Sequence, residues 1–137
     1  MNYMLIVGLL LAVVANMIIG MLWYGPVLFG DTWMKLAGVK MDPNDPNLKK
    51  EIQKCMTLSP LIALTTALVM VCFMTRMNIH TVISGALFGF TAWFGFNMTT
   101  MYNDVLYGKK SFKLYLINVG YVLASFVTMG AVLAKFI

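Results

Sequence analysis

Five uncharged polar side chains are the first candidates for chemistry in this chain. They are three asparagines and two hydroxyl residues within or beside long apolar segments: Asn16, Asn97, Asn118, Thr57 and Ser59. Amides and hydroxyls donate and accept hydrogen bonds, but without a partnered base they are weak acids, bases and nucleophiles. The chemistry that these residues offer is therefore hydrogen bonding, either to a ligand or between helices.

Charged side chains are absent from four long stretches of the sequence, which are 1–30, 55–75, 77–103 and 114–134. Ion-coupled transporters and proton pumps usually carry a charged residue inside the membrane. His80 is the only histidine, and neither it nor Cys72 has an activating partner nearby in the sequence. We therefore expect no enzymatic activity, no metal site and no cofactor.

The apolar stretches themselves predict the elements that position the polar residues. The chain is 61% hydrophobic and 11% charged, whereas soluble domains are usually ~25% charged. Each stretch reaches the ~20 residues that cross a bilayer, and the apolar runs are continuous, unlike barrel strands. We predict one all-α domain over 1–137, an integral membrane four-helix bundle with spans at about 4–24, 56–75, 79–101 and 113–134. The first span lacks a basic leader and is too long for a signal peptide, so we expect it to be retained.

The distribution of Lys and Arg predicts the orientation. Two loops on one side hold eight lysines: Lys35, Lys40, Lys49, Lys50, Lys54, Lys109, Lys110 and Lys113. The other side holds only Arg76 and Lys135. Basic loops face the cytoplasm, so both termini are expected on the non-cytoplasmic side. The net charge of +5 then favours the lipid bilayer as partner, with anionic lipid at the inner leaflet, and we expect no nucleic acid partner.

With this orientation, all five polar residues fall toward the inner half of the membrane. One interpretation is a small polar vestibule, open to the cytoplasm, that holds a neutral or weakly polar ligand. The other is hydrogen bonding between helices, which contributes ~0.6 kcal/mol per contact in membranes. The second interpretation is favoured, because asparagine commonly links membrane helices in this way.

Small residues recur at about four-residue spacing in the predicted helices. Such ladders let helix backbones approach closely, and the residues assigned to helix packing are Gly8, Ala12, Gly20, Gly85, Gly89, Gly120 and Ala124. The ladders predict tight packing, but they leave open whether these faces pack within the chain or between chains.

An aromatic turn follows the first predicted helix, in the stretch GMLWYGPVLFGDTWMKLAG. Trp and Tyr prefer the depth of the lipid headgroups, and Gly-Pro ends a helix. We predict a short interfacial helix at about 27–37, capped by Asp31 or Thr32 and ended by Gly38, and then a cytoplasmic loop over 38–54. Within that loop, Asp45 followed by Pro46 predicts a helix start. The interfacial anchors, which also form a candidate docking surface or lid, are Trp23, Tyr24, Pro26, Phe29 and Trp33.

The same stretch resembles the N-terminal signature of the domain-of-unknown-function 1761 family, which comprises small, mostly bacterial, polytopic membrane proteins. That signature has the form G-x-x-W-Y-x-P-x-x-F-G-x-x-W-x-x-x-x-G, and it matches at Gly20, Trp23, Tyr24, Pro26, Phe29, Gly30, Trp33 and Gly38. The segments 92–96 and 117–134 resemble later parts of the family. The resemblance implies four membrane helices and implies no activity.

Two functions from different classes fit these features. The first is a structural or accessory subunit that packs into a homo-oligomer or a larger membrane assembly. The second is a small oligomeric channel or carrier for a neutral or weakly polar solute. A four-helix protomer is small for a transport path of its own, so the second function requires oligomers.

Overall fold

The computed structural model describes residues 3–137, and all regular structure among them is helical. Four elements account for most of it: α1 (Tyr3–Trp23), α2 (Gly30–Ala37), α3 (Leu48–Arg76) and α7 (Phe112–Leu133). Between α3 and α7 the chain forms α4 (Val82–Ala92), the π-helix η1 (Trp93–Met98), α5 (Thr99–Met101) and α6 (Asn103–Leu106). The fold class is therefore all-α.

Three helices, α1, α3 and α7, are long and apolar enough to cross a membrane. The fourth predicted span, 79–101, is divided among α4, η1 and α5. It begins at Val82 because Thr81 and Ser84 form a reciprocal capping box, with each side chain bonded to the other's backbone N–H. The wider π turn interrupts the regular hydrogen-bond pattern from Trp93 onward, which hydropathy alone does not reveal.

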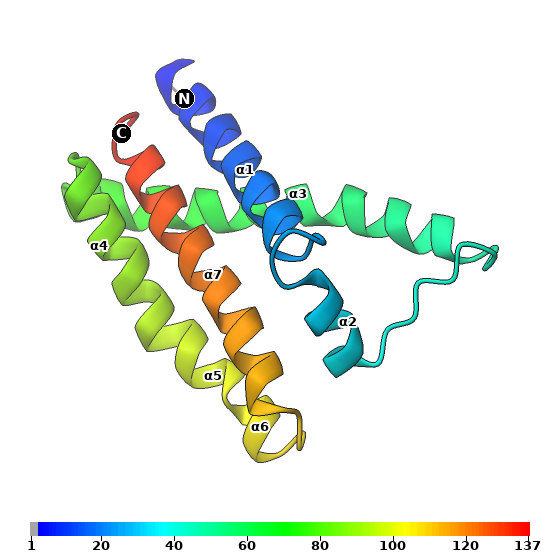
Figure 1. The fold of residues 1–137 in the computed structure, drawn as a ribbon. Helices are drawn as coiled ribbons and strands as arrows, with labels where there is room; N and C mark the ends of the chain where they lie inside the picture. Colours follow the sequence, from blue (N-terminus) through cyan, green and yellow to red (C-terminus); the bar gives the residue numbers. More distant parts are fainter. Residues whose placement is uncertain (1–2) are drawn as a thin grey trace.

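Helix α7 lies at the centre of the molecule, between α1 and α4 (Figure 1). Helix α3 crosses these three helices instead of running alongside them, and it contacts α1 and α7. Its first buried residue is Ala63. The part of α3 over 48–62, which we call the projecting arm, extends away from the other helices (Figure 1).

Glycines bring the backbones of α4 and α7 into contact. A Cβ atom added at Gly85 would lie 2.2 Å from the carbonyl oxygen of Gly130, and one added at Gly89 would lie 2.1 Å from that of Phe126. No side chain fits at such distances. The largest core cluster lies in the same half of the molecule and includes Leu9, Ala12, Ala67, Met70, Met74, Met129 and Leu133.

The aromatic turn ends α1 at Trp23 and leads into α2. The amide of Gly30 donates to the carbonyl of Gly25 (3.0 Å). A Cβ at Gly30 would lie 2.5 Å from the carbonyl oxygen of Tyr24, so this tight turn requires glycine. The turn occupies residues that the sequence assigned to the interfacial helix, and α2 therefore starts at Gly30 and not near residue 27.

The predicted helix caps are only partly correct. Gly38 ends α2 in the left-handed conformation (φ 70°), with its N–H bonded to Met34, which confirms that prediction. The cap by Asp31 or Thr32 is wrong, because Phe29 occupies the N-cap position without a side-chain bond. The helix start at Pro46 is also wrong: Asp45 accepts from the amide of Asn47 (2.9 Å) in a turn, and α3 begins at Leu48.

Candidate functional site

The indole N–H groups of all three tryptophans donate hydrogen bonds to three consecutive residues of α7. The bonds join Trp23 to the carbonyl oxygen of Ile117 (2.8 Å), Trp33 to the side-chain oxygen of Asn118 (3.1 Å), and Trp93 to the carbonyl oxygen of Val119 (2.8 Å). The three donors come from α1, α2 and η1. This short segment of α7 therefore holds α1, α2 and η1 together through hydrogen bonds.

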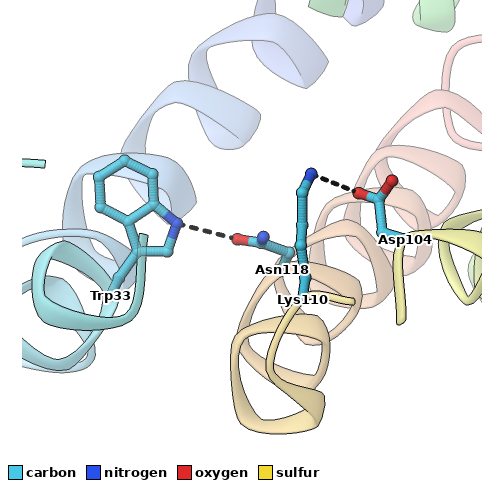
Figure 2. Close-up of polar contacts among 4 residues, drawn as sticks. All are labelled: Trp33, Asp104, Lys110 and Asn118. Atoms are coloured by element: carbon cyan, nitrogen blue, oxygen red, sulfur yellow. Dashed lines mark hydrogen bonds and ion pairs between the residues drawn. The ribbon is translucent and has the colours of Figure 1, made fainter. Parts of the chain in front are cut away.

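Asn118 is the polar centre of this arrangement. Its side-chain oxygen accepts from the Tyr24 hydroxyl (2.9 Å) as well as from Trp33 (Figure 2). An amide oxygen has two lone pairs, so these two donors use its full accepting capacity. Asn118 thus holds both the aromatic turn and α2 against α7.

Aromatic packing extends the cluster toward the middle of α1. The Tyr24 ring lies 5.5 Å from Trp33 and 5.2 Å from Tyr121, between ring centroids. The Tyr121 hydroxyl donates in turn to the side-chain oxygen of Asn16 (3.4 Å). Two tyrosines therefore link Asn16 to Asn118. We call this group the amide–aromatic cluster: Asn16, Trp23, Tyr24, Trp33, Asn118 and Tyr121.

An ion pair lies on the other side of Asn118, where Lys110 Nζ is 2.9 Å from Asp104 (Figure 2). Both side chains are more than half exposed, so the pair contributes at most about 1 kcal/mol. Asn118 and this pair border a cavity of about 10 Å³. Such a cavity holds about one water molecule and is too small for a solute.

The structure brings together two of the five residues assigned to a polar vestibule. Asn16 and Asn118 belong to the amide–aromatic cluster. Asn97 lies in η1, half-buried, and within the described residues no hydrogen bond reaches its side chain. Thr57 donates to the Gln53 carbonyl of its own helix (2.8 Å), and it lies on the projecting arm with Ser59.

The predicted anchors take different positions in the structure. Trp23, Tyr24 and Trp33 belong to the cluster, and the Phe29 ring packs 5.0 Å from that of Trp23. Pro26 is exposed in the turn.

The predicted packing residues lie mainly against helices of the same chain. In addition to the α4 glycines, Gly8 faces Phe136 and Gly20 faces Tyr121. Gly120 faces Trp23, whose ring lies 2.9 Å from the position of an added Cβ. Ala12 is fully buried, whereas Ala124 is half-buried. The small-residue ladders are therefore mostly occupied by contacts within one chain.

Sequence reasoning did not assign Tyr121 or Trp93 to the site. Tyr121 follows Asn118 by three residues, and side chains three apart share a helix face, so helical spacing could have placed Tyr121 beside the asparagine. The sequence offers no comparable indication for Trp93, because its hydrogen-bond acceptor is the backbone carbonyl of Val119, which no residue type marks.

The amide–aromatic cluster is uncharged, and its hydrogen bonds hold neighbouring elements together. Its members are amides, phenols and indoles. Among residues 3–137, no group of three or more His, Cys, Asp or Glu side chains is placed to hold a metal ion.

Comparison with known proteins places this architecture in a family. The family model described as "Protein of unknown function (DUF1761)" matches residues 7–134, from the first helix to the end of the last. No curated protein and no solved structure matches the chain. Because the match covers nearly the whole sequence, the chain belongs to the domain-of-unknown-function 1761 family.

Proposed function

We propose that this chain is a multi-pass membrane protein with a structural function, as a subunit that packs into a homo-oligomer. The observation that carries the proposal is an open apolar groove between α3 and α4, together with a projecting arm that is almost entirely exposed in the described part of the chain. A chain that leaves both features unoccupied can satisfy them with a second copy of itself.

The groove, which we call the α3/α4 groove, has a volume of about 470 Å³. Helices α3 and α4 share the turn at 77–81 and diverge from it, and α7 supplies Phe126 at the bottom of the gap. Its walls combine bulky residues with small or hydroxyl ones, including Thr65, Thr66, Phe73, Phe88, Thr91 and Ala92. The hydroxyls of Thr65, Thr66 and Thr91 donate to carbonyls of their own helices, so the groove presents an apolar surface.

The proposed occupant is the matching face of a second copy, with groove against groove and arm beside arm. Apolar side chains on the arm are exposed, among them Met56 (63%), Leu61 (56%) and Ile62 (67%). The arm and one wall of the groove belong to the same helix. A two-fold axis along the membrane normal brings equal depths of two copies together, so it would place groove against groove and arm beside arm and close the assembly as a dimer.

The small-residue surfaces are already occupied within the chain, and this supports the groove and the arm as the interface between copies. The small-residue ladders, for which the sequence left open packing within the chain or between chains, mostly face other parts of the same chain. A transport function has less support, because the polar residues assigned to a vestibule do not gather around one cavity.

The proposal includes four spans, with α4, η1 and α5 forming one crossing. The segment from Val82 to Met101 has a length of roughly 30 Å as a continuous helix, about the thickness of the hydrocarbon core. The lysine-rich loops then face the cytoplasm and both termini face the other side.

Cys55 provides a test of this topology, because it is exposed at the expected inner end of a span. In a Cys72→Ser variant, which leaves Cys55 as the only thiol, we expect a membrane-impermeant thiol reagent to label inverted vesicles and not intact cells. Labelling of intact cells would contradict the orientation.

Filling the groove tests the homo-oligomer. Thr91→Trp places a large ring in the groove, whereas Ile83→Trp makes a similar change on the same helix at a position that is 75% exposed and does not line the groove. We expect the Thr91→Trp variant to dissociate to monomer, and Ile83→Trp to keep the particle mass of the wild type. Circular dichroism checks that both variants keep their helices. If Thr91→Trp keeps the wild-type mass, lipid and not a second copy fills the groove, and the proposal is wrong.

A further inference from the structure

A second groove lies between the η1–α5 segment and the first turns of α7, with a volume of about 510 Å³. We call it the aromatic groove. Its lining is almost entirely apolar and aromatic, and includes Trp93, Thr99, Tyr102, Phe112, Tyr115 and Leu116. It is separate from the α3/α4 groove, with which it shares no lining residue.

Two hydrogen bonds fix the floor of this groove. Trp93 donates to the carbonyl of Val119 (2.8 Å), and the Tyr115 hydroxyl donates to that of Met98 (2.9 Å). Trp93, Tyr115 and Val119 are buried in one core cluster. The groove is therefore already formed in the folded chain, as an apolar trough whose floor is hydrogen-bonded and buried.

The rim of the groove remains open. Phe112 and Leu116 are 54% and 50% exposed, although they lie on α7 directly above the buried floor. The Tyr115 ring packs between Tyr102 (5.4 Å) and Phe112 (5.7 Å), measured between ring centroids. A long apolar chain could lie along this trough without displacing any of these side chains.

Positive charge gathers where the groove reaches the N-terminal end of α7. Lys109 and Lys110 lie in the loop before α7, and Lys113 lies in its first turn, next to Phe112. Lys110 is paired with Asp104. Lys109 and Lys113 are exposed, and the only ion pair among residues 3–137 involves neither of them. Two positive charges that form no ion pair among residues 3–137 therefore lie within three residues of Phe112, which lines the trough.

We propose that the aromatic groove binds one anionic phospholipid, with an acyl chain along the trough and the phosphate beside Lys109 and Lys113. This inference requires only that the chain spans a membrane, and it does not depend on the homo-oligomer. The apolar lining complements the acyl chain, and the two lysines complement the negative headgroup. A zwitterionic lipid would fill the trough equally well but would gain less from the lysines.

Other lysines on the same side lack one of these features. Lys35 and Lys40 line a hollow that also contains Asp31, whose negative charge opposes an anion. Lys50 and Lys54 lie on the projecting arm, in a shallow hollow with Gln53, Thr57 and Leu58 and without an aromatic wall. Lys50 and Lys54 therefore serve as a matched control, because their neutralisation removes the same amount of charge.

The experiment uses lipids with brominated acyl chains, which quench nearby tryptophan fluorescence. The full chain is placed in neutral phosphatidylcholine nanodiscs, and brominated phosphatidylglycerol or brominated phosphatidylcholine is added. The difference between the wild type and Trp93→Phe gives the signal of Trp93. We expect phosphatidylglycerol to quench Trp93 at a lower mole fraction than phosphatidylcholine, by a factor on the order of ten, as two lysines near an anionic headgroup would give.

The lysine variants decide whether the groove selects the headgroup. Lys109→Gln with Lys113→Gln is expected to abolish the preference, and Lys50→Gln with Lys54→Gln is expected to preserve it. Native mass spectrometry of the same proteins counts retained phosphatidylglycerol and does not depend on the Trp93→Phe variant. An equal loss in both double variants would mean diffuse surface attraction, and no preference in the wild type would mean unselective filling by lipid. Either result overturns the proposal.

Discussion

Asn118 is the residue that joins the aromatic turn and α2 to α7. Its side-chain oxygen receives one hydrogen bond from the aromatic turn and one from α2. Both hydrogen bonds are partly buried, and a lost intramolecular hydrogen bond costs stability even where water replaces it in part. Separating the turn and α2 from α7 would therefore break the hydrogen bonds of both the Tyr24 hydroxyl and the Trp33 indole.

The Asn118→Leu substitution tests this role. It removes the acceptor of two hydrogen bonds, and membrane hydrogen bonds contribute ~0.6 kcal/mol on average and up to ~1.7 kcal/mol each. We expect the free energy of unfolding, measured by denaturant titration in detergent micelles, to fall by about 1–2 kcal/mol. Asn97→Leu is the control, since within the described chain the Asn97 side chain has no hydrogen bond to lose. An equal loss in both variants would contradict the role of Asn118.

For single residues, the sequence predicts where an aromatic side chain lies along a helix better than it predicts which residue that side chain contacts. Trp23 and Tyr24 could be assigned to the end of the first helix, because Gly25-Pro26 must break it. Their hydrogen bonds to Ile117 and Asn118 could not be predicted, because those acceptors lie 94 residues further along the chain. Helical periodicity identifies a face but does not identify what that face meets.

At the scale of whole elements, glycines determine how closely α4 and α7 pack. At Gly85, Gly89 and Gly130, the backbone of one helix occupies the space that a side chain would need. Membrane helices associate through such close packing, because lipid provides little hydrophobic force between them. The position of α4, and with it one wall of the α3/α4 groove, therefore depends on these residues.

Gly89→Ala should separate the two helices. The added Cβ would lie 2.1 Å from a backbone oxygen of Phe126, which cannot move without shifting α7. We expect the free energy of unfolding to fall by about 1–3 kcal/mol, as for other overpacked cores. Gly95→Ala is the matched control, because a Cβ there meets nothing within 4 Å. Stability unchanged by Gly89→Ala would show that the helices are not in close contact.

Hydropathy locates elements but not their directions. The apolar stretches at 4–24 and 113–134 correspond to α1 (Tyr3–Trp23) and α7 (Phe112–Leu133), since length and lack of charge define such helices. The π turn of η1 and the crossing of α3 over the other helices arise from side-chain packing across the whole chain. A four-helix bundle drawn from the sequence would fill the space that the structure leaves as the α3/α4 groove.

At the scale of the whole molecule, the crossing of α3 over the other helices leaves the α3/α4 groove open and the projecting arm exposed. The small-residue faces are mostly used within the chain. Among residues 3–137, by contrast, the α3/α4 groove stays open, and the projecting arm, which extends away from the other helices (Figure 1), is almost entirely exposed. A second copy would occupy both at once. The structural function that we propose follows from this pairing, and the lipid proposed for the aromatic groove would sit outside the interface.

The most direct test is the mass of the particle extracted from its native membrane in polymer-bounded nanodiscs, with every co-purifying chain identified. We expect two copies of this 15.3 kDa chain with bound lipid, and dissociation to one copy in the Thr91→Trp variant. A wild-type particle that contains a single copy and no other protein would contradict the structural function, because the groove and the arm would then be covered by lipid alone.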